Sequence, residues 1–339
     1  MSDVVIRTSG LTKDYGQGRG VFDLDLEVHR GEVLGYLGPN GAGKSTTIRM
    51  LLDMVRPTSG SAEVLGQDPR LARPSLRARL SYIPGELSLW RGWTGAEIIG
   101  YLGSLRGGFD GARVADLAGR FQLDLSRTVA QLSKGNKQKV GLVALFAPRS
   151  ELLIMDEPTS GLDPLLQMQF QQLVREAVAD GASVLLSSHV LSEVEGVAGR
   201  VAIIRSGRLV DVLGMAQLRA KASQTVEVTF AEAVPPQLGA LEGIDLLVAD
   251  GVVARYEVTG SMDTFIKALA THTVIGLRGH DADLEQVFLR YYADPADPDP
   301  RSGLKGPSGA PAPSSWRPGV GTPADLAGPT GDTGAEPYR

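Results

Sequence analysis

The chain has 339 residues, of which 42% are hydrophobic and 22% are charged, and its formal net charge is −5. This is the composition of an ordinary globular protein, long enough for one large and one smaller domain. The acidic balance argues against a protein that coats nucleic acid, and the lack of cysteine excludes disulfides, cysteine-bound zinc and thiol catalysis.

The first part of the chain alternates between strand and helix patterns. A long run with mostly helical spacing of apolar residues, from Thr94 to Leu125, predicts a helical block inserted into an α/β frame. Strands are predicted on both sides of it, at residues 4–8, 21–28, 33–37, 61–65, 80–84, 151–157 and 182–188. Helices are predicted at residues 47–52, 140–146, 165–179 and 190–197, and a hairpin at residues 201–211.

The character of the chain changes near residue 223. A small α+β domain is predicted over residues 223–293. Its expected elements are strands at 225–230, 252–259 and 273–278, a helix at 261–270, and a helical stripe of Leu284, Val287, Phe288 and Tyr291. Residues 294–339 hold about half of the 20 prolines and are rich in Gly, Ala and Ser, so we predict a disordered tail there.

One stretch carries the most specific chemical signal. Residues 38–46 read Gly-Pro-Asn-Gly-Ala-Gly-Lys-Ser-Thr, between a strand pattern and a helical pattern. In this context glycines let backbone N–H groups turn inward as an anion nest, and the following helix adds the positive end of its dipole. Lys44 would bind nucleotide phosphates and Ser45 would bind Mg²⁺. The alternative, a plain glycine-rich turn, is disfavoured because every fixed position of the motif is filled.

Two acidic residues, Asp156 and Glu157, end a buried apolar strand well downstream of this loop. A phosphate loop needs a second acid for Mg²⁺, and a strand-end aspartate supplies it. The next carboxylate can orient or deprotonate a water that attacks the γ-phosphate. Without the phosphate loop, the same two acids would indicate a solvated turn or the start of a helix.

A second loop carries serine and glycine before a helix. Residues 132–136 read Leu-Ser-Lys-Gly-Asn, with Ser133 and Gly135 at the start of the predicted helix. A helix N-terminus can bind phosphate, but a serine in this place is also a common helix cap. The sequence of this loop alone leaves both interpretations open.

Taken in order, these motifs resemble the ATP-binding subunit of an ABC transporter. The matching stretches are residues 38–46, 132–136, 152–157, Ser160–Asp163 and Ser188-His189, and the resemblance covers residues 4–215. It implies an α/β P-loop ATPase core over residues 1–222, with a helical subdomain at about residues 85–150. The small domain resembles an extension of prokaryotic drug- and antibiotic-export cassettes.

The resemblance implies a role for each matching residue. Tyr15 would stack on adenine, the alternative being a core aromatic at a strand end. Lys44, Glu157 and His189 would take part in hydrolysis, with Glu157 on the attacking water and His189 on the γ-phosphate. The residues that would hold ATP and Mg²⁺ within one chain are Tyr15, Gly38, Pro39, Asn40, Gly41, Ala42, Gly43, Lys44, Ser45 and Thr46, with Ser45 and Asp156 on the metal. Ser133 and Gly135 would contact the γ-phosphate bound by the opposite subunit, and Asp163 would complete the nucleotide-binding set.

Two departures from the family pattern affect these assignments. The signature loop has Lys134 where glycine is common, although Ser133 and Gly135 are kept. Gly85 occupies the position of a glutamine that senses Mg²⁺ and the attacking water. We expect Glu86 to take over this contact with the metal, unless a backbone carbonyl and a water suffice.

The resemblance also implies partners. Each site in this family needs the phosphate loop of one chain and the signature loop of another, with Asp163 at the seam, so a homodimer or a paired ATP-binding subunit is expected. A polytopic membrane permease would dock on the helical block that contains Trp90, Trp93 and Tyr101, unless these aromatics belong to the core.

The cellular place of the chain is also an expectation. It has no apolar run near the ~20 residues of a membrane helix and no signal-peptide pattern at residues 1–5. If the protein works at a membrane, another chain must therefore supply the spans. The resemblance implies a peripheral subunit at the cytoplasmic face of the membrane, and the resemblance of the small domain to export cassettes implies export. The rival is a soluble cassette ATPase that acts on nucleic acid or ribosomes. It is disfavoured because the charge balance shows no basic face, and no nucleic-acid partner is expected.

Overall fold

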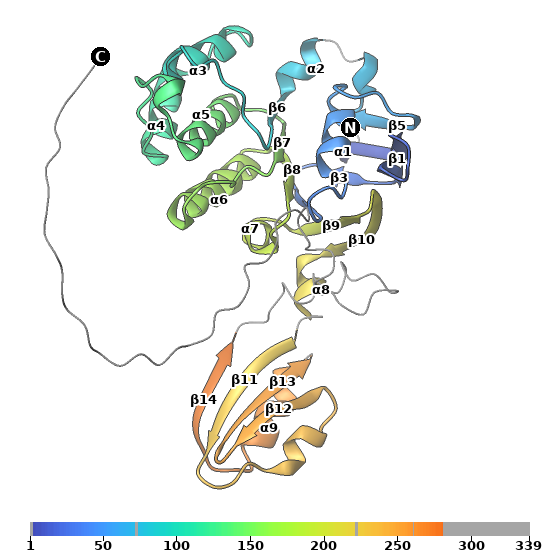
Figure 1. Ribbon diagram of the computed structural model, residues 1–339, viewed down its shortest axis with the longest axis vertical. Helices are drawn as coiled ribbons and strands as arrows, with labels where there is room; N and C mark the ends of the chain where they lie inside the picture. The colour runs from blue at the N-terminus through green and yellow to red at the C-terminus, as the bar shows by residue number, and fades with distance from the viewer. Residues whose placement is uncertain (1–2, 72–73, 221–222, 260, 281–339) are drawn as a thin grey trace, which may run out of the picture. The chain divides into compact units, whose positions relative to one another are not determined.

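The computed structural model describes residues 3–71, 74–220, 223–259 and 261–280 (Figure 1). The predictions for Leu284, Val287, Phe288 and Tyr291, and for the tail at residues 294–339, lie outside the described residues. Within the described ranges the strands form three sheets, one of six strands and two of four. An α/β core with a phosphate loop after a buried strand is thereby confirmed.

The six-stranded sheet forms the centre of the core. Its strand order is β10-β9-β4-β8-β7-β6, and all pairings are parallel except that of β9 with β10. Every residue of β4, β7 and β8 is buried, as expected for parallel strands covered on both faces. The bounds are β4 (Val33–Leu37), β6 (Leu80–Ile83), β7 (Leu152–Asp156), β8 (Ser183–Ser188), β9 (Arg200–Arg205) and β10 (Arg208–Gly214).

A four-stranded antiparallel sheet is built around β1 (Val4–Asp14), which is longer than predicted. It pairs with β2 (Gly20–Leu24), β3 (Glu27–His29) and β5 (Ser59–Val64). The prediction of one continuous strand at 21–28 is wrong. The buried Thr8 hydroxyl donates to Leu24 O and accepts from Leu26 N–H, both at 2.8 Å, and so separates β2 from β3.

Helices follow the strands of the core. The run predicted as mostly helical at 94–125 forms two helices, α3 (Gly95–Ser104) and α4 (Gly111–Arg120). Helix α3 begins with a capping box of Thr94 and Glu97. The short α2 was not predicted. The other helices of this part are α1 (Lys44–Leu51), η1 (Pro69–Leu71), α2 (Pro74–Arg79), η2 (Val129–Gln131), α5 (Lys134–Phe146), α6 (Pro164–Ala179), α7 (Leu191–Glu195) and α8 (Met215–Ala220).

The helical block formed by α3, α4 and α5 shares one apolar core with the central sheet. The three helices gather together in Figure 1. Phe121 at the end of α4 and Phe146 at the end of α5 are fully buried, and Phe146 meets Phe170 of α6 at 6.2 Å between ring centroids. The same cluster of buried side chains includes Leu153 and Met155 of β7. The helical block therefore packs directly on the strand that carries Asp156.

The remaining described residues form a small antiparallel sheet in the order β12-β13-β11-β14. Its core contains Tyr256 and Phe265, whose ring centroids lie 5.1 Å apart. Strand β12 was not predicted, because six of its seven residues are exposed and its polarity does not alternate. The elements are β11 (Ser223–Phe230), η3 (Pro236–Ala240), β12 (Ile244–Asp250), β13 (Val253–Thr259), α9 (Met262–Leu269) and β14 (Val274–His280). No helix among the described residues is long and apolar enough to span a membrane.

The packing of β4 gives a testable prediction. A Cβ added at Gly35 would overlap Cγ1 of Val194 and lie 3.1 Å from Cγ1 of Val201, both on stiff buried side chains. We expect Gly35→Ala to lower the free energy of unfolding by about 1–3 kcal/mol through overpacking, measured by chemical denaturation. Gly100→Ala, in α3 with nothing within 4 Å, is the control and should be neutral or slightly stabilising. Equal stability of the two variants would contradict the packing argument.

Candidate functional site

The carboxyl ends of β4, β8, β7 and β6 meet at one edge of the central sheet, where parallel α/β sheets bind ligands. The register pairs Leu37 of β4 with Ser188 of β8, and Ser187 of β8 with Asp156 of β7. Three segments far apart in the sequence are thereby neighbours at this edge. They are the phosphate loop, the pair Asp156-Glu157 and the segment that ends in His189.

The phosphate loop has the geometry of an anion cradle. Gly41 and Gly43 have φ values of +82° and +111°, which side-chain-bearing residues rarely adopt. A Cβ at Gly38 would lie 2.5 Å from Ile204 O, so space as well as conformation requires glycine there. Helix α1 starts at Lys44 without a side-chain cap among the described residues. Its first N–H groups, which have no partner within the helix, can therefore bind phosphate oxygens.

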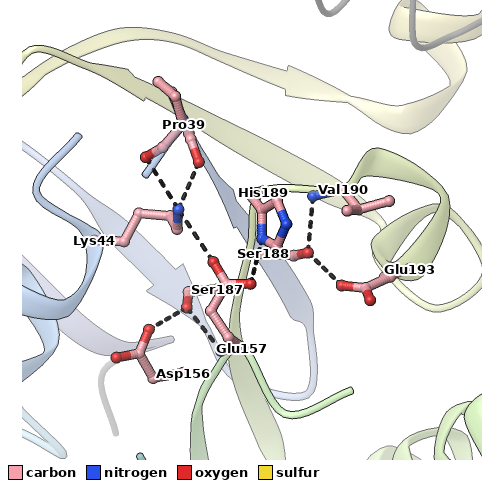
Figure 2. A network of polar contacts seen from close by, with 10 residues as sticks. Pro39, Lys44, Asp156, Glu157, Ser187, Ser188, His189, Val190 and Glu193 are labelled. Carbon is pink, nitrogen blue, oxygen red and sulfur yellow. Dashed lines mark hydrogen bonds and ion pairs between the residues drawn. The ribbon is translucent and has the colours of Figure 1, made fainter. Parts of the chain in front are cut away.

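Glu157 connects Lys44 with His189 (Figure 2). Its Oε1 lies 3.2 Å from Lys44 Nζ, and its Oε2 lies 2.6 Å from His189 Nδ1. The ammonium of Lys44 also donates to Gly38 O at 2.5 Å and to Pro39 O at 3.2 Å. Lys44 is buried, whereas the His189 side chain is 47% exposed. The carboxylate thus spans the distance from the buried base of the phosphate loop to the solvent side.

The backbone of Glu157 is held in an unusual conformation. Its φ is +48°, in the left-handed region that costs a non-glycine residue about 1 kcal/mol or more. Its N–H donates to Ser187 O at 3.1 Å and lies 3.2 Å from Ser187 Oγ. The neighbouring strand therefore compensates for this strain and fixes the direction of the Glu157 side chain.

Ser187 is a site residue that the sequence did not reveal. Its hydroxyl donates to Asp156 Oδ1 at 2.6 Å while it accepts from Glu157 N–H, so one serine orients both acids (Figure 2). Asp156 is only 5% exposed. The pKa of the neighbouring Tyr82 is raised, mainly because Tyr82 itself is partly buried and further because of the negative charge of Asp156. In the sequence, the only signal for Ser187 would have been a polar residue paired with the strand-end Asp156. That pairing is visible only once the register of β7 and β8 is known.

A cleft of about 470 Å³ lies beside the phosphate loop. Tyr15 is 51% exposed on its rim, with Lys13 Nζ over its ring at 5.3 Å from the centroid, so the interpretation of Tyr15 as a core aromatic is wrong. The lining residues are Tyr15, Gly18, Arg19, Gly20, Pro39, Asn40, Gly41, Ala42, Gly43, Lys44, Ser45, Thr46, Glu157 and Ser206. Predicted nucleotide-binding residues from β1, β4 and β7 are therefore gathered in one place.

The donor set of this cleft fits Mg²⁺ bound together with a nucleotide. The structure's described part contains no group of three or more acidic or histidine side chains that could hold a metal by themselves. Mg²⁺ characteristically takes one or two protein oxygens and completes its shell with phosphate oxygens and water. The hydroxyl of Ser45, which lines the cleft, and the carboxylate of Asp156, buried next to the cleft residue Glu157, are the protein oxygens that fit that arrangement.

The structure places the loop of Ser133 and Gly135 next to the loop of Asp163. None of these three residues lines the cleft. Ser133 caps α5 by accepting from Asn136 N–H at 3.2 Å, and Asp163 caps α6 by accepting from Leu166 N–H at 3.0 Å. A Cβ at Gly135 would lie 2.7 Å from the carbonyl oxygen of Gly161, so the two loops are in contact. Within the described chain, neither loop contributes to the lining of the cleft.

The residues near the missing glutamine also lie outside the cleft lining as described. Gly85 lies against β7, since a Cβ there would be 3.3 Å from Asp156 O, and Glu86 is exposed to solvent. The aromatic residues of the helical block form a partly exposed cluster, with ring centroids 5.1–5.5 Å apart. Because Trp90, Trp93 and Tyr101 are 37–50% exposed, the interpretation of these aromatics as core residues is wrong.

Comparisons with known proteins identify the family of this chain. A family model described as ABC transporter matches residues 21–160. The daunorubicin resistance ATP-binding protein DrrA3 of Streptomyces coeruleorubidus is 33% identical over 312 residues, which cover 87% of this chain and 98% of that protein. This chain belongs to the ABC transporter family, as an ATP-binding subunit. The resemblance drawn from the motifs is thereby confirmed.

Other members of the ABC family match as well. The daunorubicin/doxorubicin resistance ATP-binding protein DrrA of Streptomyces peucetius is 40% identical over 211 residues, 60% of this chain and 64% of that protein, so less than two thirds of its length is matched. The bacitracin transport ATP-binding protein BcrA of Bacillus licheniformis is 29% identical over 300 residues, which cover 84% of this chain and 96% of that protein.

Solved structures of the ABC family show the same fold. The structure of an ATP-binding subunit of an ABC transporter superposes with a TM-score of 0.58 at 31% identity, covering 63% of this chain and 92% of that chain. Proteins of the ABC family hydrolyse ATP to power transport, so this chain is an ATP-hydrolysing subunit. The rival interpretation, a soluble ATPase that acts on nucleic acid or ribosomes, is not favoured by these relatives.

The position of Ser187 gives a prediction for turnover. Ser187→Ala removes the hydrogen bond to Asp156 Oδ1 and leaves both acids less well oriented. We expect kcat for ATP hydrolysis to fall by about tenfold, equivalent to about 1.4 kcal/mol in the barrier, while ATP affinity changes little. Steady-state hydrolysis and equilibrium ATP binding measure the two effects.

The matched control is Ser183→Ala on the same strand. Ser183 is equally buried and accepts from Gly31 N–H at 2.9 Å, so this variant also loses a hydrogen bond, but far along β8 from the acids. It should keep its kcat. If both variants lose turnover equally, the effect comes from weakened packing of β8 and the positioning role of Ser187 is refuted.

Proposed function

We propose that this chain powers the export of a drug- or antibiotic-like compound through a membrane permease. Support comes from relatives whose names state daunorubicin resistance and bacitracin transport, two of which align over at least 96% of their length. The observation that carries the ATPase part is the Glu157 carboxylate, held between Lys44 and His189 at the mouth of the phosphate loop. Transport itself requires a partner that spans the membrane.

The roles proposed for the site follow from its geometry. The phosphate loop and Lys44 bind the β- and γ-phosphates of ATP, and Tyr15 offers its exposed ring to adenine. Glu157 orients the attacking water and accepts its proton. With Nδ1 engaged by Glu157, the Nε2 atom of His189 is the nitrogen that contacts the γ-phosphate.

Magnesium is proposed as the metal of this site. When bound with ATP, Mg²⁺ neutralises phosphate charge as hydrolysis proceeds. Ser45 and Asp156 hold it from the protein side, and Ser187 keeps the Asp156 carboxylate in place. Glu86, exposed at the end of β6, remains the proposed additional contact in place of the missing glutamine.

We propose that two ATP-binding subunits act together. Ser133, Gly135 and Asp163 lie outside the cleft of their own chain, in loops that contact each other. A second subunit facing the phosphate loop would bring its own copies of these residues to the γ-phosphate and complete the site. ATP then favours the closed pair by binding both halves, and loss of the γ-phosphate removes that preference.

Replacement of Glu157 tests the proposed chemistry. Glu157→Gln keeps the shape of the side chain but cannot accept a proton, so ATP should bind and turn over at least about 100-fold more slowly. Because ATP persists, a closed dimer should accumulate, visible by light scattering. Glu63→Gln on the exposed part of β5 is the control for the same chemical change and should behave as the wild type. Full turnover by Glu157→Gln would remove it from the mechanism.

A search for the partner tests the transport function. Purification of this chain from detergent-solubilised membranes of its own cell should recover a polytopic membrane protein in near-equal amount. The double variant Trp90→Ala/Trp93→Ala should lose that partner while keeping ATP binding, because the partly exposed aromatic cluster is the proposed docking surface. Leu71→Ala, which removes another exposed apolar side chain, should keep it. Recovery with ribosomes or nucleic acid instead would overturn the proposal.

A further inference from the structure

The cleft beside the phosphate loop has a rim that the family motifs do not explain. Gly18, Arg19 and Gly20, between β1 and β2, contribute to its lining. The two cationic side chains of the described lining are Lys44 and Arg19, and the acidic one is Glu157. Arg19 has no role in the motif-based assignment, so its place in the cleft needs an explanation of its own.

The turn that presents Arg19 is held by its own backbone. Tyr15 N–H donates to Arg19 O at 2.9 Å, and Arg19 N–H donates back to Gly16 O at 3.1 Å. Positive φ values of 83°, 56° and 71° at Gly16, Gln17 and Gly18 close the turn tightly. Arg19 therefore has a position fixed relative to Tyr15, the residue proposed to stack on adenine.

The same turn is attached to the phosphate loop. A Cβ at Gly43 would lie 3.4 Å from Gly20 O, so the residue after Arg19 lies directly against the loop. Phe22 N–H donates to Gly207 O at 2.7 Å, and Gly207 N–H donates to Ala42 O at 2.9 Å. Three loops are thus connected, and Arg19 lies between the proposed base-stacking ring and the phosphate cradle.

The charges in the cleft indicate what Arg19 is for. The ammonium of Lys44 has the opposite charge of the Glu157 carboxylate at 3.2 Å and also donates hydrogen bonds to two backbone carbonyl oxygens. Across the described residues no carboxylate pairs with the exposed Arg19 guanidinium. A polyphosphate entering this cleft carries several negative charges, and a guanidinium offers planar, forked donors that match phosphate oxygens.

We propose that Arg19 binds the α- or β-phosphate of the nucleotide and positions the triphosphate between Tyr15 and the phosphate loop. This inference rests on the ATP site described above. It makes Arg19 a determinant of affinity for nucleoside di- and triphosphates, while hydrolysis stays with the residues around Glu157.

The test compares ligands that differ in their phosphates. ATP, ADP and adenosine are titrated calorimetrically into wild-type protein and into Arg19→Ala, which keeps both backbone hydrogen bonds of the turn. We expect Kd for ATP and for ADP to rise by about tenfold, the typical loss of one charge-assisted hydrogen bond, and Kd for adenosine to stay unchanged. In steady-state hydrolysis KM should rise and kcat at saturating ATP should stay. The Kd values of Arg19→Lys for ATP and ADP should lie between those of the wild type and of Arg19→Ala, because lysine keeps the charge but not the forked donors.

The control Arg149→Ala removes the same charge from an exposed residue of the α5–β7 loop and should bind all three ligands like the wild type. Unchanged ATP and ADP affinity in Arg19→Ala, with a wild type that binds ATP, would overturn the inference alone. An equal loss for adenosine would assign Arg19 to the base and overturn it too. A wild type that does not bind ATP would overturn the proposed function together with it.

Discussion

The parallel pairing of β8 between β4 and β7 is the constraint on which the rest of the site depends. The register aligns Leu37 with Ser188 and Asp156 with Ser187, so the carboxyl ends of the three strands lie at the same level of the sheet. Ser187 can then hold both acids, and Glu157 can reach from Lys44 to His189. A shift of one residue would turn the Ser187 hydroxyl to the opposite face of the sheet and break every one of these contacts.

A second constraint is the close contact among three loops around the nucleotide cleft. The β1–β2 turn, the phosphate loop and the β9–β10 turn are connected through Gly20, Gly207 and Ala42, where glycine lets backbones approach closely. A Cβ at Gly207 would meet the carbonyl of Gly20, so this arrangement tolerates no side chain there. The walls of the cleft are consequently joined by backbone hydrogen bonds, and such preorganisation lowers the entropy lost on binding.

The strand that ends at the two acids also packs against the helical block. Asp156 and Glu157 end the strand whose buried side chains share a core with α5 and the helical block. Gly85, at the end of β6, lies against the backbone of Asp156. The exposed aromatic cluster lies at the edge of this block, because Trp90 and Trp93 precede α3 and their rings contact Tyr101 of that helix.

The sequence by itself determined the local features of this protein. The phosphate loop, the strand-end acids and most helices were predicted correctly, because each depends on residues close together in the chain. The division between β2 and β3, the edge strand β12, the role of Ser187 and the place of Arg19 were not. Each of these depends on a contact across the fold, such as Thr8 with Leu24 and Leu26, or Gly20 with Gly43. Tertiary structure decided them because strand register and loop contact join residues whose spacing in the chain carries no pattern.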